Sequence, residues 1–199
     1  AIEQERSLKR FEYILGFPQQ GRPVIDAHLK SGWERVQMID IFSHKKTALK
    51  QRSLLCDRIY NFSNTVPSGA VEFLESKEYR NTRWLNHPEC SYIVLQRHSS
   101  LIVIKQYGLV GHILDLYGYH EDVQKLLEDA KTLAYRHKWN ELTIWNAENE
   151  YHHDDIISCG FEHGSNFGSS IELLAVKINA TKNLKFDRCH FMMGSEEGY

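Results

Sequence analysis

Apolar and polar residues alternate in short runs through the second half of the chain, and these runs predict a series of β-strands. Between them, Val123, Leu127, Ala130 and Ala134 recur at helical spacing, which predicts one long helix. Acidic residues in its first turn and basic residues in its last turn match the helix dipole. Strands are predicted over 92–95, 101–104, 112–117, 142–145, 170–178 and 189–193, and helices over 120–137 and 150–158.

This order, β-β-β-α-β-α-β-β, predicts an α/β (mixed α+β) fold with a mixed central sheet flanked by helices. The strands before and after the long helix should pair in parallel around a right-handed crossover, and the hairpin strands should pair antiparallel. A further helix is predicted over 71–85, with Phe73, Leu74 and Trp84 as its apolar contacts.

The first 45 residues repeat, in a shorter form, the order of elements predicted between 142 and 178. Both stretches predict a strand, a polar turn, a short helix, a glycine followed by an aromatic residue, and a second strand. The two glycine-aromatic pairs are Gly32-Trp33 and Gly160-Phe161. We interpret residues 1–45 as a partial copy that precedes a domain of residues 46–199. The alternative is that any α/β chain repeats such units.

A two-stranded unit on its own would be only marginally stable in water and would leave an open sheet edge. We therefore expect residues 1–45 to join the sheet of residues 92–193, or to pair with the same segment of a second chain in a homodimer. In either case Trp33 and Phe17 should be mostly buried at the junction.

Composition and charge argue against several classes of partner. The 199 residues include 24 basic and 26 acidic side chains, so the formal net charge of −2 favours neither nucleic acid nor another polyanion. Apolar runs stay far below the roughly 20 residues that span a bilayer, and the polar start has no signal-peptide core. The four cysteines form no CxxC pair. We expect a cytoplasmic protein with no nucleic-acid or membrane partner.

Asn149, the short helix after it and Gly160-Phe161 precede the last two predicted strands. This arrangement resembles the GNAT superfamily of acyl-CoA-dependent N-acetyltransferases, and so does the order of elements over residues 92–193. Two further stretches resemble a subgroup of two-copy GNAT-like proteins. They are Arg83-Trp84-Leu85-Asn86-His87-Pro88, followed by Tyr92, and Gly16-Phe17-Pro18, followed by Gly32-Trp33.

The resemblance implies an enzyme that transfers an acyl group from acetyl-CoA or another acyl-CoA to an amine on a small molecule or a sugar. It also implies that backbone amides at the start of the long helix bind the cofactor diphosphate. Here that turn has a single glycine and is followed by Glu121 and Asp122, and Ile156 stands where the family has a general-acid tyrosine. A catalytically degenerate GNAT-fold binding or assembly protein is therefore the alternative. The cofactor-binding positions implied are Leu116, Tyr117, Gly118, Tyr119 and His120.

Asp115 is the candidate general base, because attack on a thioester requires a neutral amine. It lies in an otherwise apolar strand, and the alternative is an aspartate that faces outwards or pairs with an arginine. If Asp115 is the base, Asn149 or Tyr151 would position the acyl group or the thiolate.

A cation, two aromatic rings and an imidazole surround a proline turn and are candidates for the wall of an acceptor pocket. In the alternative, Trp84 anchors a helix to the sheet while Arg83 points to water. These candidate substrate-binding residues are Arg83, Trp84, His87 and Tyr92.

The run His152-His153-Asp154-Asp155 contains residue types that bind metals. Adjacent helical side chains point about 100° apart, so the two histidines cannot easily face one ion. We therefore predict no metal and interpret the run as a solvated polar face.

Overall fold

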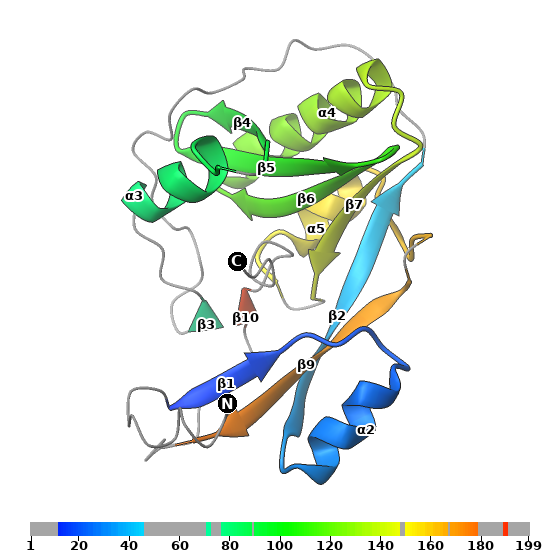
Figure 1. Ribbon diagram of the computed structural model, residues 1–199. Coiled ribbons are helices and arrows are strands. Elements are labelled where there is room, and N and C mark those ends of the chain that lie inside the picture. The colour runs from blue at the N-terminus through cyan, green and yellow to red at the C-terminus, as the bar shows by residue number, and fades with distance from the viewer. Residues whose placement is uncertain are drawn as a thin grey trace.

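The computed structural model describes residues 12–45, 71–72, 77–88, 90–147, 150–166, 168–178 and 189–190. Its main feature is an eight-stranded sheet in the order β1-β9-β2-β7-β6-β5-β4, with β8 paired to β2 (Figure 1). The strands are β1 (Tyr13–Gly16), β2 (Glu34–His44), β4 (Ile93–Arg97), β5 (Ser100–Tyr107), β6 (Val110–Tyr117), β7 (Glu141–Asn146), β8 (Glu162–His163) and β9 (Ser170–Lys177). The helices are α2 (Pro23–Lys30), α3 (Lys77–Arg80), the π-helical η1 (Asn81–Leu85), α4 (His120–Arg136) and α5 (His153–Ser158).

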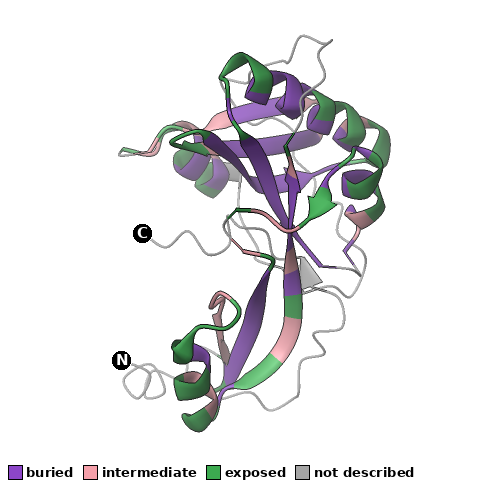
Figure 2. Ribbon diagram, turned by 90° about the vertical axis from the view of Figure 1, so that its right-hand side faces the viewer, coloured by how far each residue is buried: buried purple, intermediate pink, exposed green. Residues whose placement is uncertain are grey.

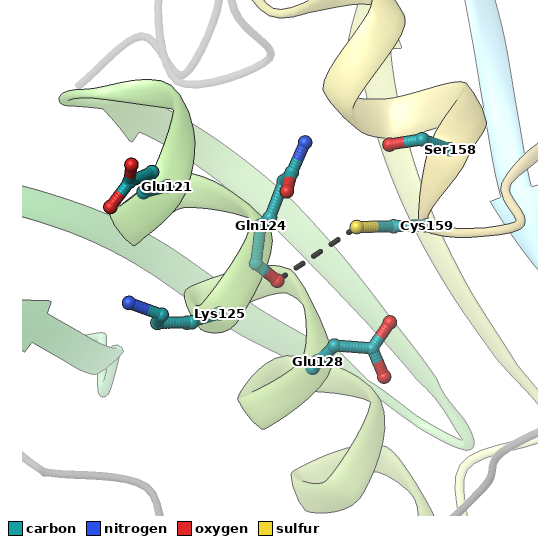
Figure 3. Close-up of a pocket in the computed structure, with 6 residues that line it drawn as sticks. All are labelled: Glu121, Gln124, Lys125, Glu128, Ser158 and Cys159. Atoms are coloured by element: carbon teal, nitrogen blue, oxygen red, sulfur yellow. Dashed lines mark hydrogen bonds between the residues drawn. The ribbon is translucent and has the colours of Figure 1, made fainter.

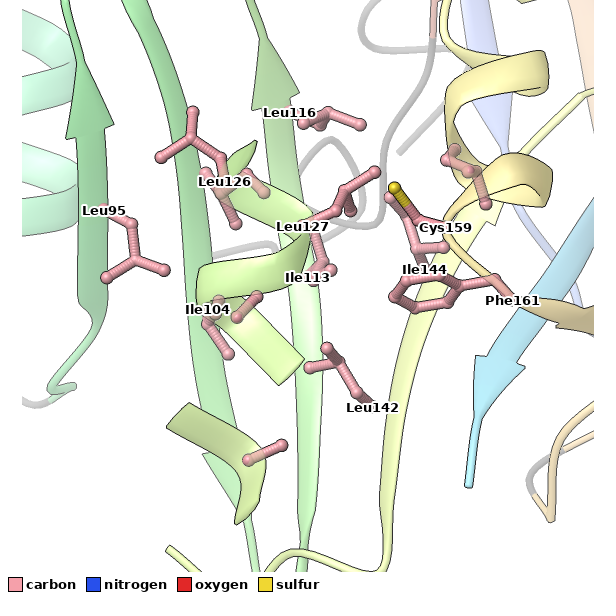
Figure 4. Packing of buried hydrophobic residues seen from close by; sticks show 14 of the residues in the cluster. Leu95, Ile104, Ile113, Leu116, Leu126, Leu127, Leu142, Ile144, Cys159 and Phe161 are labelled. Carbon is pink, nitrogen blue, oxygen red and sulfur yellow. The ribbon is translucent and has the colours of Figure 1, made fainter. Parts of the chain in front are cut away.

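The predicted mixed sheet is confirmed, because β6 and β7 pair in parallel around α4 while the other neighbours in the sheet pair antiparallel. Helices α4 and α5 cover one face, and η1 packs on the other. Side chains of β5 alternate between these faces. Ile102 joins the core under α4 together with Ile104, which Figure 4 shows, while Leu101 and Val103 pack with Trp84. No helix within the described ranges is both long and apolar enough to cross a membrane.

Two predictions for the ends of this region were confirmed only in part. The helix predicted over 71–85 is confirmed over Lys77–Leu85 as α3 and η1, whereas Val71–Glu72 form strand β3. The strand predicted over 189–193 is confirmed at Cys189–His190, but these residues form β10 and pair in parallel with β3 instead of extending the main sheet. Backbone committed to a strand ladder cannot also form helical hydrogen bonds. Phe73 and Leu74 lie outside the described residues.

The amino-terminal unit joins the main sheet by an exchange of strands. The first part of β2 pairs with β9, and its end pairs with β7. Strand β9 in turn lies between β2 and β1. Each of the two repeated units, β1-α2-β2 and β7-α5-β9, therefore inserts its last strand into the other unit. This confirms that the amino-terminal residues add to the sheet.

The repeated glycine-aromatic pairs end α2 and α5 in the same way. Gly32 and Gly160 have φ angles of 86° and 78°. In both, the glycine amide donates to the carbonyl three residues back and the aromatic amide to the carbonyl five residues back. These are the hydrogen bonds of a Schellman motif. Trp33 and Phe161 are then buried, while Phe17 is half-buried against Trp145.

Only glycine adopts such positive φ angles at little cost, and a Cβ on Gly32 or on Gly160 would meet no atom within 3.8 Å. We expect Gly32→Ala and Gly160→Ala each to lower the free energy of unfolding by about 1–2 kcal/mol. Gly→Asn at the same positions should cost less, because asparagine tolerates the left-handed region. Urea unfolding tests this, and equal losses for alanine and asparagine would contradict it.

His44 ends β2 with its ring 5.6 Å from that of Phe161. Burial, assisted by Lys131, lowers its pKa below the ordinary value. The unfolded chain therefore takes up a proton at a higher pH than the folded protein does, and stability is lost as the pH falls below about 6.5.

We expect His44→Gln to reduce this loss of stability between pH 7 and pH 5. His137→Gln, at an exposed position, should leave the loss unchanged. The measurement is the free energy of unfolding in urea at several pH values, and an unaltered pH slope in His44→Gln would refute the assignment.

Candidate functional site

The carboxyl ends of β6 and β7 meet the amino termini of α4 and α5, which is where open α/β sheets bind ligands. Pairing between β6 and β7 stops at Ile113 and Ile144, although the strands continue to Tyr117 and Asn146. The β5–β6 register also shifts next to Ile113, which marks a β-bulge at this point. The two parallel strands therefore separate just before α4 and α5 begin.

One group of polar residues is centred on Asp155 of α5. Its Oδ2 lies 2.6 Å from Nδ1 of His120 and 3.0 Å from Nδ1 of His152, and its Oδ1 accepts a hydrogen bond from Gln124 at 2.9 Å. His152 and Asp155 are buried, whereas His120 is exposed. Burial lowers the pKa of His152 against the opposing effect of Asp155. We call these four residues, His120, Gln124, His152 and Asp155, the His-Asp cluster.

This cluster corrects the expectation of a solvated face over residues 152–155. His152 and His153 do diverge as expected, but His152 is bonded to Asp155, one turn further along α5, and His120 of α4 is bonded to the same carboxylate oxygen. Tyr151 covers the group, with its ring 4.5 Å from that of His120 and 4.8 Å from that of His152. Asn149, which was predicted to act beside Tyr151, lies outside the described residues.

A second polar network begins at the end of β7. Asn146 is fully buried; its amide donates to Glu150 at 2.9 Å, and its oxygen lies 2.9 Å from Nδ1 of His153. Sequence reasoning missed Asn146, although an asparagine that ends an apolar strand before a helix is a detectable signal. The network fixes the chain between β7 and α5.

The turn after β6 contains the predicted cofactor-binding residues. Gly118 has φ 138°, and any Cβ there would overlap the side chain of Ser100. The Ser100 hydroxyl accepts a hydrogen bond from the Tyr119 amide at 3.0 Å. Within the described part of the chain, the amides of His120 and Glu121 have no acceptor. The turn therefore offers two backbone donors at the positive end of α4.

Two of the other predicted cofactor-binding residues have side chains that are buried against the faces of the sheet. Leu116 is buried in the core under α4, and Tyr117 packs on the opposite face with Arg80 4.9 Å from its ring. Tyr119 is exposed. Leu116 and Tyr117 could contact a ligand only through their backbone.

The acidic residues of the first turn of α4 point to opposite sides. Asp122 lies 3.0 Å from Nδ1 of His98 in the β4–β5 hairpin. Glu121 lines a groove of about 500 Å³ between α4 and α5 (Figure 3). Cys159 lies in this groove and donates to the Gln124 carbonyl at 3.8 Å, and burial raises the pKa of its thiol. A thiol in this state is a structural group rather than a nucleophile.

Asp115 is buried on β6, opposite Val103 and on the face that η1 covers. It therefore does not face outwards into solvent. Its role as a general base remains a prediction.

The four predicted substrate-binding residues lie together, Arg83 and Trp84 in η1 and His87 and Tyr92 in the segment that follows it. The ring of Tyr92 is 5.0 Å from that of Trp84 and 5.9 Å from that of His87. Trp84 is buried in the apolar cluster of this face, so it does anchor η1 to the sheet. Arg83 does not point to water, because it is buried 4.4 Å from the Trp84 ring and donates to the Tyr79 hydroxyl at 2.9 Å. Whether these residues contact an acceptor remains a prediction.

Solved structures with the same architecture identify the fold. A GCN5-related N-acetyltransferase from Sphaerobacter thermophilus matches with a TM-score of 0.50 and 12% identity, covering 87% of this chain and 62% of that one. A GCN5-related N-acetyltransferase from Kribbella flavida also matches with a TM-score of 0.50 and 12% identity, covering 89% of this chain and 46% of that one. This chain has the GNAT fold.

The GNAT fold alone does not assign an activity. A functionally unknown conserved protein from Staphylococcus epidermidis matches with a TM-score of 0.54 and 8% identity, covering 89% of this chain and 77% of that one. No protein-family model and no curated protein matches the sequence. Because the chain spans 62% and 46% of the two N-acetyltransferase chains, their activity is not carried over as a whole.

Because Asn146 is buried and bonded at both ends of its amide, we expect Asn146→Ala to lower the free energy of unfolding by about 1–3 kcal/mol. His153→Ala, which removes only one of the two bonds, should cost about 1 kcal/mol. Chemical denaturation measures both, and an Asn146→Ala variant as stable as the parent would show that the network is dispensable.

Proposed function

We propose that the protein is an acyl-CoA-dependent N-acyltransferase that acts on an amine of a small molecule or a sugar. The observation that carries the proposal is the separation of β6 from β7 directly before the amino terminus of α4. An extended ligand lying between the separated strands would meet backbone groups that no neighbouring strand occupies. Its anionic end would meet the start of α4.

The residues at the start of α4 fit the diphosphate of such a donor. The amides of His120 and Glu121 are available, and the helix dipole adds positive charge. The Asp122 carboxylate is already bonded to His98. The Asp155 carboxylate is already bonded to the two histidines of the His-Asp cluster. Glu121 alone among these acids lines the open groove and opposes the anion.

Acyl-CoA, when bound, supplies an activated thioester. We assign to Asp115 the removal of a proton from the acceptor amine, directly or through water. Tyr151 and Asn149 would orient the acyl group. The group of Arg83, Trp84, His87 and Tyr92 would form the acceptor side, since it lies on the same face of the sheet as Asp115.

A degenerate GNAT-fold protein that binds or assembles without catalysis is the second candidate. It is favoured by the acidic first turn of α4, by the Ser100 hydroxyl that occupies the Tyr119 amide, and by Ile156, which is buried in the core where the family has a tyrosine. In that role a second copy of the chain is the partner that we would test first.

Acetyl-CoA binding is the first test, because only the transferase candidate requires it. At about 100 times its dissociation constant, acetyl-CoA should stabilise the protein by about 2.7 kcal/mol, measured as a thermal shift. Glu121→Gln removes a negative charge at the start of α4 and should tighten binding about two- to fivefold. Glu34→Gln makes the same change at a distant exposed position and should have no effect. Absence of any shift at millimolar acetyl-CoA would leave only the degenerate candidate.

The assignment of Asp115 predicts a separate effect on turnover. Asp115→Asn should lower kcat about 100-fold or more while leaving acetyl-CoA affinity unchanged, because loss of a general base affects the chemical step. A steady-state assay over a panel of amines, combined with calorimetry of acetyl-CoA binding, makes the comparison. Normal turnover in this variant would place the base elsewhere.

A further inference from the structure

We propose that the His-Asp cluster is a binding site for a divalent metal ion of the zinc type, with His120, His152 and Asp155 as its ligands. One potential ligand atom from each of the three residues lies within 4.8 Å of the other two. Two imidazoles and one carboxylate form a ligand set that holds zinc and related ions in proteins. The proposal does not rest on the proposed acyl transfer.

The three ligands come from two separate elements and are held in place before any ion binds. His120 is the first residue of α4, while His152 and Asp155 lie at the start of α5. His152 and Asp155 are buried, so their rotamers are fixed by packing. Such preorganisation is what a site needs to bind an ion without a large ordering cost.

Gln124 gives the carboxylate its orientation. Its amide donates to Oδ1 of Asp155 at 2.9 Å, which leaves Oδ2 facing both imidazoles. A hydrogen bond to the carboxylate oxygen that does not bind the metal is a common supporting contact in metal sites. Gln124 is thus a positioning residue rather than a ligand.

The site has an open side and a surplus of negative charge. The side chain of His120 is half exposed, so an ion can enter there and keep a water molecule as a fourth ligand. The first turns of the two helices also carry Glu121, Asp122 and Asp154, and these carboxylates favour a cation in their neighbourhood.

The distances describe the hydrogen-bonded form of the cluster. Each imidazole lies at hydrogen-bond distance from Oδ2 of Asp155, at 2.6 and 3.0 Å. An ion bound to both Nδ1 atoms would replace these hydrogen bonds, and each ring proton would move to Nε2. The imidazoles must also approach each other, because zinc ligands at about 2.0–2.1 Å from the ion lie closer together than 4.8 Å. The exposed ring of His120 is the one free to make this movement.

The test is a Zn²⁺ titration of the untagged, metal-depleted chain against a chromophoric chelator, followed by Co²⁺ substitution and its visible spectrum. We expect one equivalent to bind with a dissociation constant of about 1 µM or tighter. His120→Ala and Asp155→Asn should weaken binding at least tenfold, and Gln124→Ala about tenfold. His153→Ala, next to a proposed ligand but outside the cluster, and His137→Ala, at an exposed position, should bind like the parent.

Two results would overturn the proposal. One is a dissociation constant for Zn²⁺ of about 100 µM or weaker in the unmodified protein. The other is His120→Ala binding Zn²⁺ with the parental stoichiometry and affinity, which would place the ion elsewhere. Because His120 is exposed, His120→Ala should remain folded. It therefore tests the proposal even if Asp155→Asn fails to fold. Neither readout involves acetyl-CoA, so the acyltransferase proposal can fail while the metal site stands.

Discussion

The arrangement depends on the pairing of β2 with two different strands. Over its 11 residues, β2 bonds to β9 along its first part and to β7 at its end. It thereby joins the β4–β7 part of the sheet, with α4 and α5, to the part formed by β1, β9 and α2 (Figure 1). Burial follows the same path, since β2 is largely exposed or half-buried at its start and buried toward β7 (Figure 2). Without β2, β7 and β9 would each lose a neighbour and expose a sheet edge.

The same pairing explains why the polar groups of the site can be buried. On one side β7 is held by β2 up to Asn146, while on the other side its bonds to β6 end at Ile144. The end of β7 is therefore still held by one neighbouring strand after it has lost the other. A rigid frame is needed to keep Asn146 and Asp155 bonded inside the protein, because a buried polar group without a partner costs about 1–3 kcal/mol.

Sequence reasoning found the elements whose signals are local. The helical spacing in α4 and the glycine-aromatic pairs that end α2 and α5 each depend on residues within a few positions, and the structure confirms them. It failed for β3 and for the pairing partner of β10, because this pairing joins residues more than 100 positions apart. The His-Asp cluster was missed for a similar reason. His152 and His153 do diverge on α5, but His120 reaches Asp155 from α4, and the residue pattern of one helix does not indicate such a contact.

The charges at the start of α4 determine how well this end of the sheet could bind a diphosphate. A diphosphate there gains two backbone donors and the helix dipole, but it must approach Glu121. The opposing carboxylate acts through solvent at the edge of an open groove, where screening limits its effect to about 1 kcal/mol or less. One carboxylate of that strength would weaken acyl-CoA binding severalfold without abolishing it. The acidic turn is therefore compatible with a transferase of modest donor affinity. In the proposed transferase, the missing tyrosine at Ile156 would affect the chemical step instead, so a loss of catalysis would not require a loss of acyl-CoA binding.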